Sequence, residues 1–146
     1  MLADPPATVA LGARLAAVAQ PGDVITLSGP LGAGKTSLAR AMLAALGFAG
    51  EAQSPSFAIV HPYDPPETRL SVRHVDLYRL DGPADLAELG LDDDGADALL
   101  LVEWPERAGT GYWPDALALS FDVLADGRRV LTADVPAAWV GRWPLP

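Results

Sequence analysis

The segment that most constrains the fold lies between residues 29 and 36. It reads Gly-Pro-Leu-Gly-Ala-Gly-Lys-Thr and fits G-x-x-x-x-G-K-[ST], the pattern of loops that bind phosphate. An apolar, β-branched run at residues 23–28 precedes it and predicts a buried strand. Strong helix formers follow at residues 36–46 and stop at Gly47, which predicts a helix with a C-terminal cap. A strand, a glycine-rich loop and a helix in direct succession indicate an α/β fold.

The composition of this loop suits the capture of a triphosphate. Glycines allow a tight turn whose successive N–H groups point into one concavity and hold phosphate oxygens. The following helix adds unpaired N–H groups and the positive end of its dipole. Lys35 is expected to reach the β- and γ-phosphates, and the Thr36 hydroxyl to ligate Mg²⁺. Lys35 is the only lysine in the chain, and arginine supplies the other nine cations, which favours this interpretation over a solvated surface turn.

The composition places the chain among globular proteins of one domain. Its 146 residues are 50% hydrophobic and include 14 glycines and 14 prolines, too few for a disordered, low-complexity chain. The absence of cysteine excludes disulfides, thiolate metal sites and cysteine nucleophiles. A net charge of −9 argues against autonomous nucleic-acid binding, which normally needs a basic face. With no secretory signal and no uncharged stretch of the roughly 18–20 residues that span a membrane, we expect a cytoplasmic protein.

The rest of the chain alternates short apolar runs with turn residues. We expect a single P-loop NTPase-type domain over residues 1–135, with a mixed β-sheet and added antiparallel hairpins flanked by helices. Residues 136–146 are rich in proline and tryptophan and are interpreted as a C-terminal tail. The other expected elements are a helix from Pro5 to Ala19, a hairpin of strands at 57–63 and 70–76, a short helix at 83–89, a central strand at 98–103, and a second hairpin of strands at 116–124 and 128–134.

Two carboxylates stand at the ends of predicted strands. A phosphate loop that uses Mg²⁺ needs an acidic group at the end of a neighbouring strand, and Glu103 follows a continuous apolar run. We favour this role for Glu103 over a glutamate that faces solvent. Asp76 closes another predicted strand and is a candidate to position Mg²⁺, its water shell or an attacking water, with a simple cap as the alternative. His74 beside it is interpreted as a structural histidine.

Five segments occur in a characteristic order along the chain. They are Leu-Gly-Ala-Gly-Lys-Thr (31–36), Ser-Pro-Ser-Phe (54–57), His-Val-Asp-Leu-Tyr-Arg-Leu (74–80), Glu-Leu-Gly (88–90) and Val-Glu-Trp-Pro-Glu-Arg (102–107). This series resembles the TsaE (formerly YjeE) family, small bacterial P-loop ATPases of tRNA threonylcarbamoyladenosine (t6A) biosynthesis. The third and fifth segments are far more specific than the phosphate loop. Ser56 departs from the family, which usually has Thr there, but it keeps the hydroxyl of a segment suited to sensing a γ-phosphate.

The resemblance implies a role for each matching residue. Lys35, Asp76 and Glu103 would form the catalytic centre, and Thr36 and Glu103 would serve Mg²⁺. The resemblance also implies contacts with ATP. Trp104 would lie beside the nucleotide, and Gly127 and the segment near Pro5 would approach its adenine side. The phosphates would be bound by Leu31, Gly32, Ala33, Gly34, Lys35 and Thr36.

The resemblance also implies partners. Proteins named TsaB and TsaD form the heterodimer that transfers threonylcarbamoyl to adenosine 37 of ANN-decoding tRNAs, and ATP hydrolysis by TsaE acts as a switch that supports its turnover. Hydrolysis is expected to be weak without these partners, and tRNA would be reached only through them. Two alternatives remain. A small-molecule kinase would need an arginine-rich lid, whereas the arginines here are scattered, and a non-hydrolysing nucleotide-binding adaptor would share every binding feature.

Overall fold

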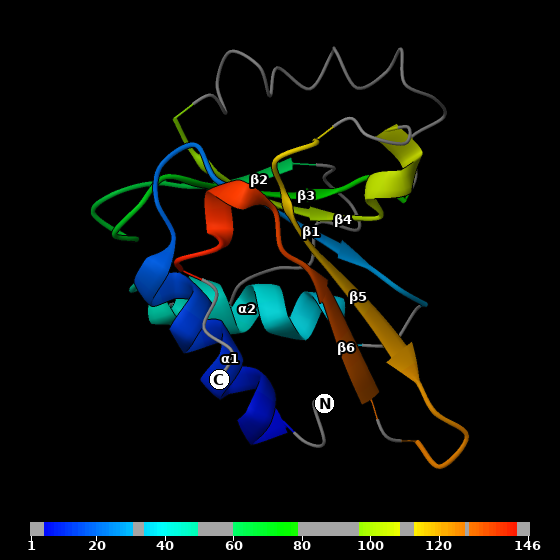
Figure 1. Cartoon of the computed structure of the whole chain (residues 1–146). Coiled ribbons are helices and arrows are strands. Elements are labelled where there is room, and N and C mark those ends of the chain that lie inside the picture. The colour runs from blue at the N-terminus through cyan, green and yellow to red at the C-terminus, as the bar shows by residue number, and fades with distance from the viewer. Residues whose placement is uncertain are drawn as a thin grey trace.

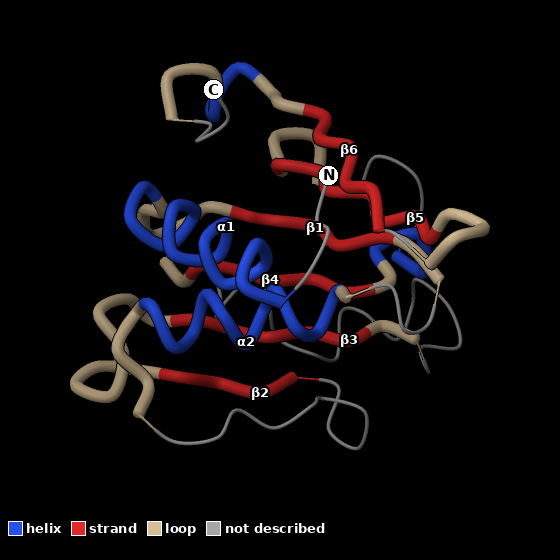
Figure 2. The backbone as a smooth tube through the Cα atoms, turned by 90° about the horizontal axis from the view of Figure 1, so that it is seen from below, coloured by secondary structure: helices blue, strands red, loops and turns tan. Residues whose placement is uncertain are grey.

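A computed structural model describes residues 5–30, 34–49, 60–78, 97–108, 113–127 and 129–142. These residues form one six-stranded sheet with two helices over one of its faces (Figures 1 and 2). The helices are α1 (Pro5–Val18) and α2 (Lys35–Ala45), and the strands are β1 (Val24–Ser28), β2 (Val60–Tyr63), β3 (Val72–Asp76), β4 (Leu99–Glu103), β5 (Leu117–Val123) and β6 (Arg129–Asp134). Two short 3₁₀ helices follow β4 and β6, at Pro105–Ala108 and Ala137–Trp139. The predicted α/β fold is confirmed.

The sheet is mixed, as predicted, and its strand order is β2-β3-β4-β1-β5-β6. The four inner strands β3, β4, β1 and β5 run parallel, while the outer strands β2 and β6 pair antiparallel with β3 and β5. Both predicted hairpins are therefore present. We call the edge at which the four parallel strands end the carboxyl edge, and the opposite edge the amino edge. Ligands of open α/β sheets bind outside the carboxyl edge.

The apolar composition of β4 explains its place inside the sheet. All five of its residues are buried, which is typical of a parallel strand covered on both faces. On one face, Leu99 and Leu101 pack in a core that also holds Leu38 and Met42 of α2 and Leu15 of α1. Figure 2 shows both helices over this face. On the other face, alternate side chains form a second, smaller cluster of Val75, Leu77, Leu100 and Val102.

Several predicted boundaries move by one or two residues, and two predicted features are outside the part of the chain that the structure describes. Helix α2 begins and ends one residue earlier than the predicted range of 36–46, and α1 begins at Pro5 as predicted but ends at Val18, one residue early. The predicted short helix at 83–89 and the first residues of the strand at 57–63 lie outside the described residues. Trp139 is fully buried in the main core, so the chain packs against the domain well beyond residue 135. No helix in the described ranges is long and apolar enough to cross a membrane.

Candidate functional site

Two glycines of the phosphate-loop motif adopt backbone conformations that suit glycine alone. Gly29 follows β1 with φ 140°, and a Cβ atom placed there would lie 2.5 Å from the carbonyl oxygen of Phe121 on β5. Gly34 is the N-cap of α2 with φ 108° and makes no side-chain capping hydrogen bond. The first turn of α2 therefore opens at the carboxyl edge beside the end of β1, in the arrangement of an anion-binding helix N-terminus. Leu31, Gly32 and Ala33 lie outside the described residues.

The Lys35 side chain is buried at this helix start. Its Nζ donates a hydrogen bond to the carbonyl oxygen of Gly29 at 2.5 Å and lies 3.5 Å from the centre of the Trp104 ring. Burial lowers the pKa of Lys35, and the negative charges of Glu103, Glu106 and Asp76 oppose this shift. The carbonyl and the indole are both neutral, so an anionic phosphate would supply the full opposite charge that this desolvated ammonium favours.

Glu103 at the end of β4 joins residues from two other elements. The Thr36 hydroxyl on α2 donates a hydrogen bond to Glu103 Oε1 at 2.8 Å, and His74 Nε2 on β3 lies 2.7 Å from Glu103 Oε2. Glu103 and His74 are both buried. The structure therefore brings the predicted magnesium pair, Thr36 and Glu103, into direct contact across 67 positions of sequence.

Asp76 ends β3 at the same level as Glu103 on β4. The two are register partners in the parallel pair, so their side chains leave the same face of the sheet at the carboxyl edge. Burial raises the pKa of Asp76, and the nearby Glu103 charge adds to the rise. The backbone N–H of Tyr78, which donates to Asp76 Oδ1 at 2.9 Å, opposes it, as do the charges of His74 and Lys35. A carboxyl group that binds a proton more readily than usual fits the predicted placement of Asp76 beside an attacking water.

Trp104 has a strained backbone that brings its ring to the site. Its φ is 60°, in the left-handed region that non-glycine residues rarely adopt. Its N–H donates to the carbonyl oxygen of Leu27 at 3.2 Å, which ties the chain after β4 to the end of β1. The indole lies under the Lys35 ammonium and contacts the Tyr78 ring, with 4.9 Å between ring centres. Trp104 thus lies beside the lysine of the phosphate loop.

The donor set at the carboxyl edge fits Mg²⁺ and a nucleotide phosphate chain. A hydroxyl and a carboxylate, both oxygen donors, lie together at Thr36 and Glu103, next to the Lys35 ammonium. No group of three or more histidine or acidic side chains able to hold a metal ion occurs in the described ranges. Mg²⁺ typically needs only one or two protein carboxylates, because phosphates and waters fill its remaining positions.

Two predicted contacts of the adenine side make none of the interactions described for this cluster of side chains. Gly127 is in the turn between β5 and β6 with φ 86°, and a Cβ atom there would meet nothing within 4 Å. Pro5 begins α1. The interactions described above link neither position to Lys35, Thr36 or Glu103, so their proposed role remains a prediction. The segment of Ser54 and Ser56 lies outside the described residues.

The sequence interpretation missed one participant, His74. The sequence favours a structural role for it, yet the only side-chain hydrogen bond that it makes among the described residues is with Glu103. The signal was present in the spacing. His74 and Asp76 are two residues apart on one strand and share a face, and β3 lies in register beside β4. Finding the contact required the register of the two strands, which a single sequence does not give.

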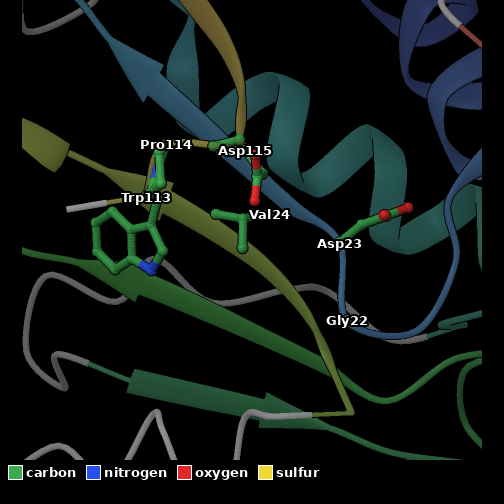
Figure 3. Close-up of a pocket in the computed structure, with 7 residues that line it drawn as sticks. Gly22, Asp23, Val24, Trp113, Pro114 and Asp115 are labelled. Atoms are coloured by element: carbon green, nitrogen blue, oxygen red, sulfur yellow. The ribbon is translucent and has the colours of Figure 1, made fainter. Parts of the chain in front are cut away.

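A separate cavity of about 260 Å³ opens at the amino edge of the sheet. Figure 3 shows Trp113 on one side of it and Val24 and Asp115 beside it, while the Asp23 side chain points away from the indole. Its other lining residues are Gly22, Pro114 and Ala116. This cavity lies at the starts of β1 and β5, at the opposite edge from Lys35 and Glu103, and contains none of the predicted site residues.

Comparison with known proteins identifies relatives over nearly the whole chain. Residues 2–130 match the family model described as "Threonylcarbamoyl adenosine biosynthesis protein TsaE". The tRNA threonylcarbamoyladenosine biosynthesis protein TsaE of Streptomyces coelicolor is 42% identical in an alignment 145 residues long, which covers 86% of this chain and 95% of that protein. The protein of the same name from Mycobacterium leprae is 38% identical and covers 91% and 85%. The crystal structure of Bacillus subtilis YdiB superimposes with a TM-score of 0.74 at 30% identity, over 92% of this chain and 82% of that one.

Proposed function

The chain belongs to the TsaE family of threonylcarbamoyl adenosine biosynthesis proteins, and from this premise we propose that it binds and hydrolyses ATP with Mg²⁺ at the carboxyl edge of its sheet. The observation that carries the proposal is the contact of Thr36 with Glu103, directly beside the buried Lys35. A hydroxyl, a carboxylate and an ammonium at one helix start form the protein part of a nucleotide-phosphate site.

Each residue then has a defined task. Lys35 binds the β- and γ-phosphate oxygens, which replace the Gly29 carbonyl as partner of its ammonium. Leu31, Gly32, Ala33 and Gly34 contribute backbone N–H groups to the same phosphates. Thr36 and Glu103 hold Mg²⁺, which when bound neutralises charge that develops on the phosphate oxygens.

Asp76 is the proposed catalytic acceptor of a proton. It stands level with Glu103 on the neighbouring strand, and burial raises its pKa. In the ionised form it accepts the proton of a water that attacks the terminal phosphate, and a raised pKa makes the carboxylate a stronger base. This feature favours hydrolysis over a purely nucleotide-binding adaptor, which would need Lys35 and Thr36 but no group with such a pKa.

The names of the relatives support a role in tRNA threonylcarbamoyladenosine biosynthesis, and the resemblance to the TsaE family suggests the partners. We propose that the protein acts in the cytoplasm as an ATP-dependent switch on a heterodimer of TsaB and TsaD, which modifies tRNA. The ordering of the segment that contains Ser54 and Ser56 by the γ-phosphate, and its release on hydrolysis, would be the switching event. With a net charge of −9, the chain suits an assembly in which its partners bind the tRNA.

Titration calorimetry and an ATPase assay on two substitutions in α2 test the proposal. Lys35→Ala is expected to lower ATP affinity by about 100-fold or more, because it removes the charged contact to the phosphates. Arg40→Ala is the matched control, since Arg40 is an exposed cation on the same helix, and its ATP affinity should stay within about two-fold of wild type. Retained ATP affinity in Lys35→Ala contradicts the assignment of the loop.

The switch is tested separately with the partner proteins. Binding to TsaB and TsaD is measured with ATP and without nucleotide, and ATP hydrolysis is measured with and without the heterodimer. We expect binding to depend on the nucleotide and the heterodimer to accelerate hydrolysis. Binding that ignores nucleotide contradicts the switch, and the absence of any hydrolysis in the full mixture supports the adaptor instead.

A further inference from the structure

His74 is the fully buried polar side chain of β3, and it faces the site. It lies on the sheet face that the helices cover, where its neighbours Val72, Leu99 and Leu101 are apolar. Its Nε2 lies 2.7 Å from Glu103 Oε2. Its Nδ1 is buried without a hydrogen-bond partner among the described residues. The single polar contact of this imidazole is therefore directed at the carboxylate at the end of β4.

The chemistry of the pair fixes the direction of the hydrogen bond. A carboxylate only accepts hydrogen bonds, so Nε2 must carry the hydrogen and donate it to Oε2. Thr36 donates to the other oxygen, Oε1. Each oxygen of Glu103 is thus held by one donor, from α2 on one side and from β3 on the other. Two donors on two different elements fix both the position and the plane of a carboxylate.

A purely structural role explains this histidine poorly. An apolar side chain such as leucine would match its neighbours but would leave Oε2 of the buried Glu103 without a donor. His74 supplies that donor, although it buries an unpaired nitrogen at a cost in stability. Structural polar networks in protein interiors normally satisfy all their members. Here the satisfied atom is the one that touches Glu103. This asymmetry is expected when a side chain serves a functional group beside it.

We infer that His74 is a positioning residue that orients Glu103 for Mg²⁺, so that the carboxylate and the Thr36 hydroxyl meet the metal together. His74 acts only through Glu103 and touches neither metal nor nucleotide. The inference rests on the proposed function, because it presupposes Mg²⁺ at Thr36 and Glu103. Partners of this kind typically change metal affinity by about 10- to 100-fold when they are removed.

The first test uses the nucleotide-free protein. Nitrogen-15 NMR of the histidine side chains distinguishes a protonated from an unprotonated ring nitrogen, so it reports the hydrogen-bond direction without any nucleotide or metal. We expect Nε2 of His74 to carry a hydrogen, and its signal to change in Glu103→Ala. An unprotonated Nε2, or a signal that is unaffected by removal of Glu103, overturns the inference.

The second test compares substitutions that keep or remove the donor. His74→Gln places an amide N–H near the position of Nε2, whereas His74→Phe keeps a ring without a donor and His74→Asn has an amide too short to reach. We expect the Mg²⁺ concentration for half-saturation of the nucleotide complex to rise about ten-fold in the Phe and Asn variants, and to stay within about three-fold of wild type in the Gln variant. Nucleotide affinity without Mg²⁺ should change less than three-fold in all of them, since the Lys35 contacts remain.

His61 supplies the matched control. It is the register partner of His74 on β2, shares its sheet face and also buries an unpartnered Nδ1, but its ring stacks on Tyr63. His61→Phe should leave the Mg²⁺ requirement unchanged. A comparable rise in His61→Phe, or a Gln variant as weak as Asn, overturns the positioning role. If Mg²⁺ has no influence on nucleotide binding by the wild-type protein, the proposed Mg²⁺ site at Thr36 and Glu103 is contradicted, and with it the proposed function. A failure confined to the His74 variants leaves that function intact.

Discussion

The two edges of the parallel strands carry charge in opposite ways. At the carboxyl edge, Asp76 and Glu103 place two acidic groups at the same level, and Lys35 is buried against a carbonyl and an indole. At the amino edge, Asp23 forms an ion pair with Arg142, whose Nη1 and Nη2 lie 2.6 and 3.1 Å from the two carboxylate oxygens. At the carboxyl edge, the Lys35 ammonium contacts neutral groups and two carboxylates lie close together. At the amino edge, a carboxylate and a guanidinium form an ion pair.

The amino edge shows what charged groups do when they serve the fold. Arg142 also donates to the carbonyl oxygen of Val18 at 3.0 Å, and its guanidinium lies over the buried Trp139. The hydrogen bond to Asp23 raises the pKa of Arg142. A bidentate pair of this kind ties the end of the chain to the start of β1, close to the cavity in Figure 3.

At the carboxyl edge, by contrast, charged groups are buried at a cost to the fold. Burial shifts the pKa values of Lys35 and Asp76 towards their neutral forms, and Trp104 keeps a left-handed backbone. Strain and unfavourable burial that collect on one edge of a sheet are typical of a binding site, because the protein gives up stability there to hold reactive groups in place. Substitutions at the two edges should therefore change different properties of the protein.

The largest expected effect comes from Glu103→Ala, compared with Asp23→Ala at the other edge. Removal of Glu103 takes away a proposed ligand of Mg²⁺, so hydrolysis that depends on Mg²⁺ should fall by about 100-fold, while nucleotide binding without Mg²⁺ stays within about three-fold. Asp23→Ala should leave hydrolysis within about two-fold, measured at a temperature where the variant stays folded. Equal losses of hydrolysis and of Mg²⁺-free binding in Glu103→Ala would mean that Glu103 is structural.

The second effect concerns stability at the amino edge. Arg142→Ala and Asp23→Ala should each lower the free energy of unfolding by about 2 kcal/mol, because the pair is bidentate and partly shielded from solvent. The double variant should lose less than the sum, with a coupling of about 1 kcal/mol. Urea denaturation of the four proteins measures this cycle. Additive losses would show that the two side chains act independently.

The residues of the carboxyl edge could largely be predicted from the sequence, whereas the ion pair of the amino edge could not. The phosphate-loop pattern and the apolar run before Glu103 gave the order of strand, loop and helix and identified Lys35, Thr36 and Glu103. Local sequence patterns are enough to predict this site, because the spacing of the glycines and the lysine determines the conformation of the backbone next to them. The strand order and the parallel register are long-range properties, so the contact of His74 with Glu103 could not be predicted.

The tail illustrates the same limit at the amino edge. Its prolines and tryptophans show no periodic pattern, so the sequence predicts only a C-terminal tail over residues 136–146 and leaves open whether it packs on the domain or docks elsewhere. In the structure Trp139 enters the main core and Arg142 reaches Asp23, which lies 119 positions earlier. A pairing over that distance depends on the finished fold, and neither partner carries a local signal for it.

The smallest expected effect is a gain in stability at the carboxyl edge. Burial raises the pKa of Asp76 above its ordinary value of 3.8. Ionisation of this carboxyl group is therefore less favourable in the folded protein than in the unfolded chain, which costs stability at neutral pH. Stability due to this group is therefore greatest at low pH and is lost as the pH rises from about 3.8 through the higher pKa of the folded state. Asp76→Asn removes the penalty, while its side-chain oxygen can still accept from the Tyr78 N–H.

We expect Asp76→Asn to raise the free energy of unfolding by about 1 kcal/mol at pH 7, and this gain should shrink towards zero as the pH approaches 4. Asp115→Asn is the matched control, because it is the same substitution on an exposed aspartate beside the start of β5, and its effect should stay within about 0.5 kcal/mol at every pH. Urea denaturation between pH 4 and 8 measures both variants. A gain in Asp76→Asn that grows on acidification would contradict the raised pKa of this carboxyl group. A gain that Asp115→Asn reproduces would remove the distinction between the two edges, because the penalty would then come from the net charge of −9 rather than from the site.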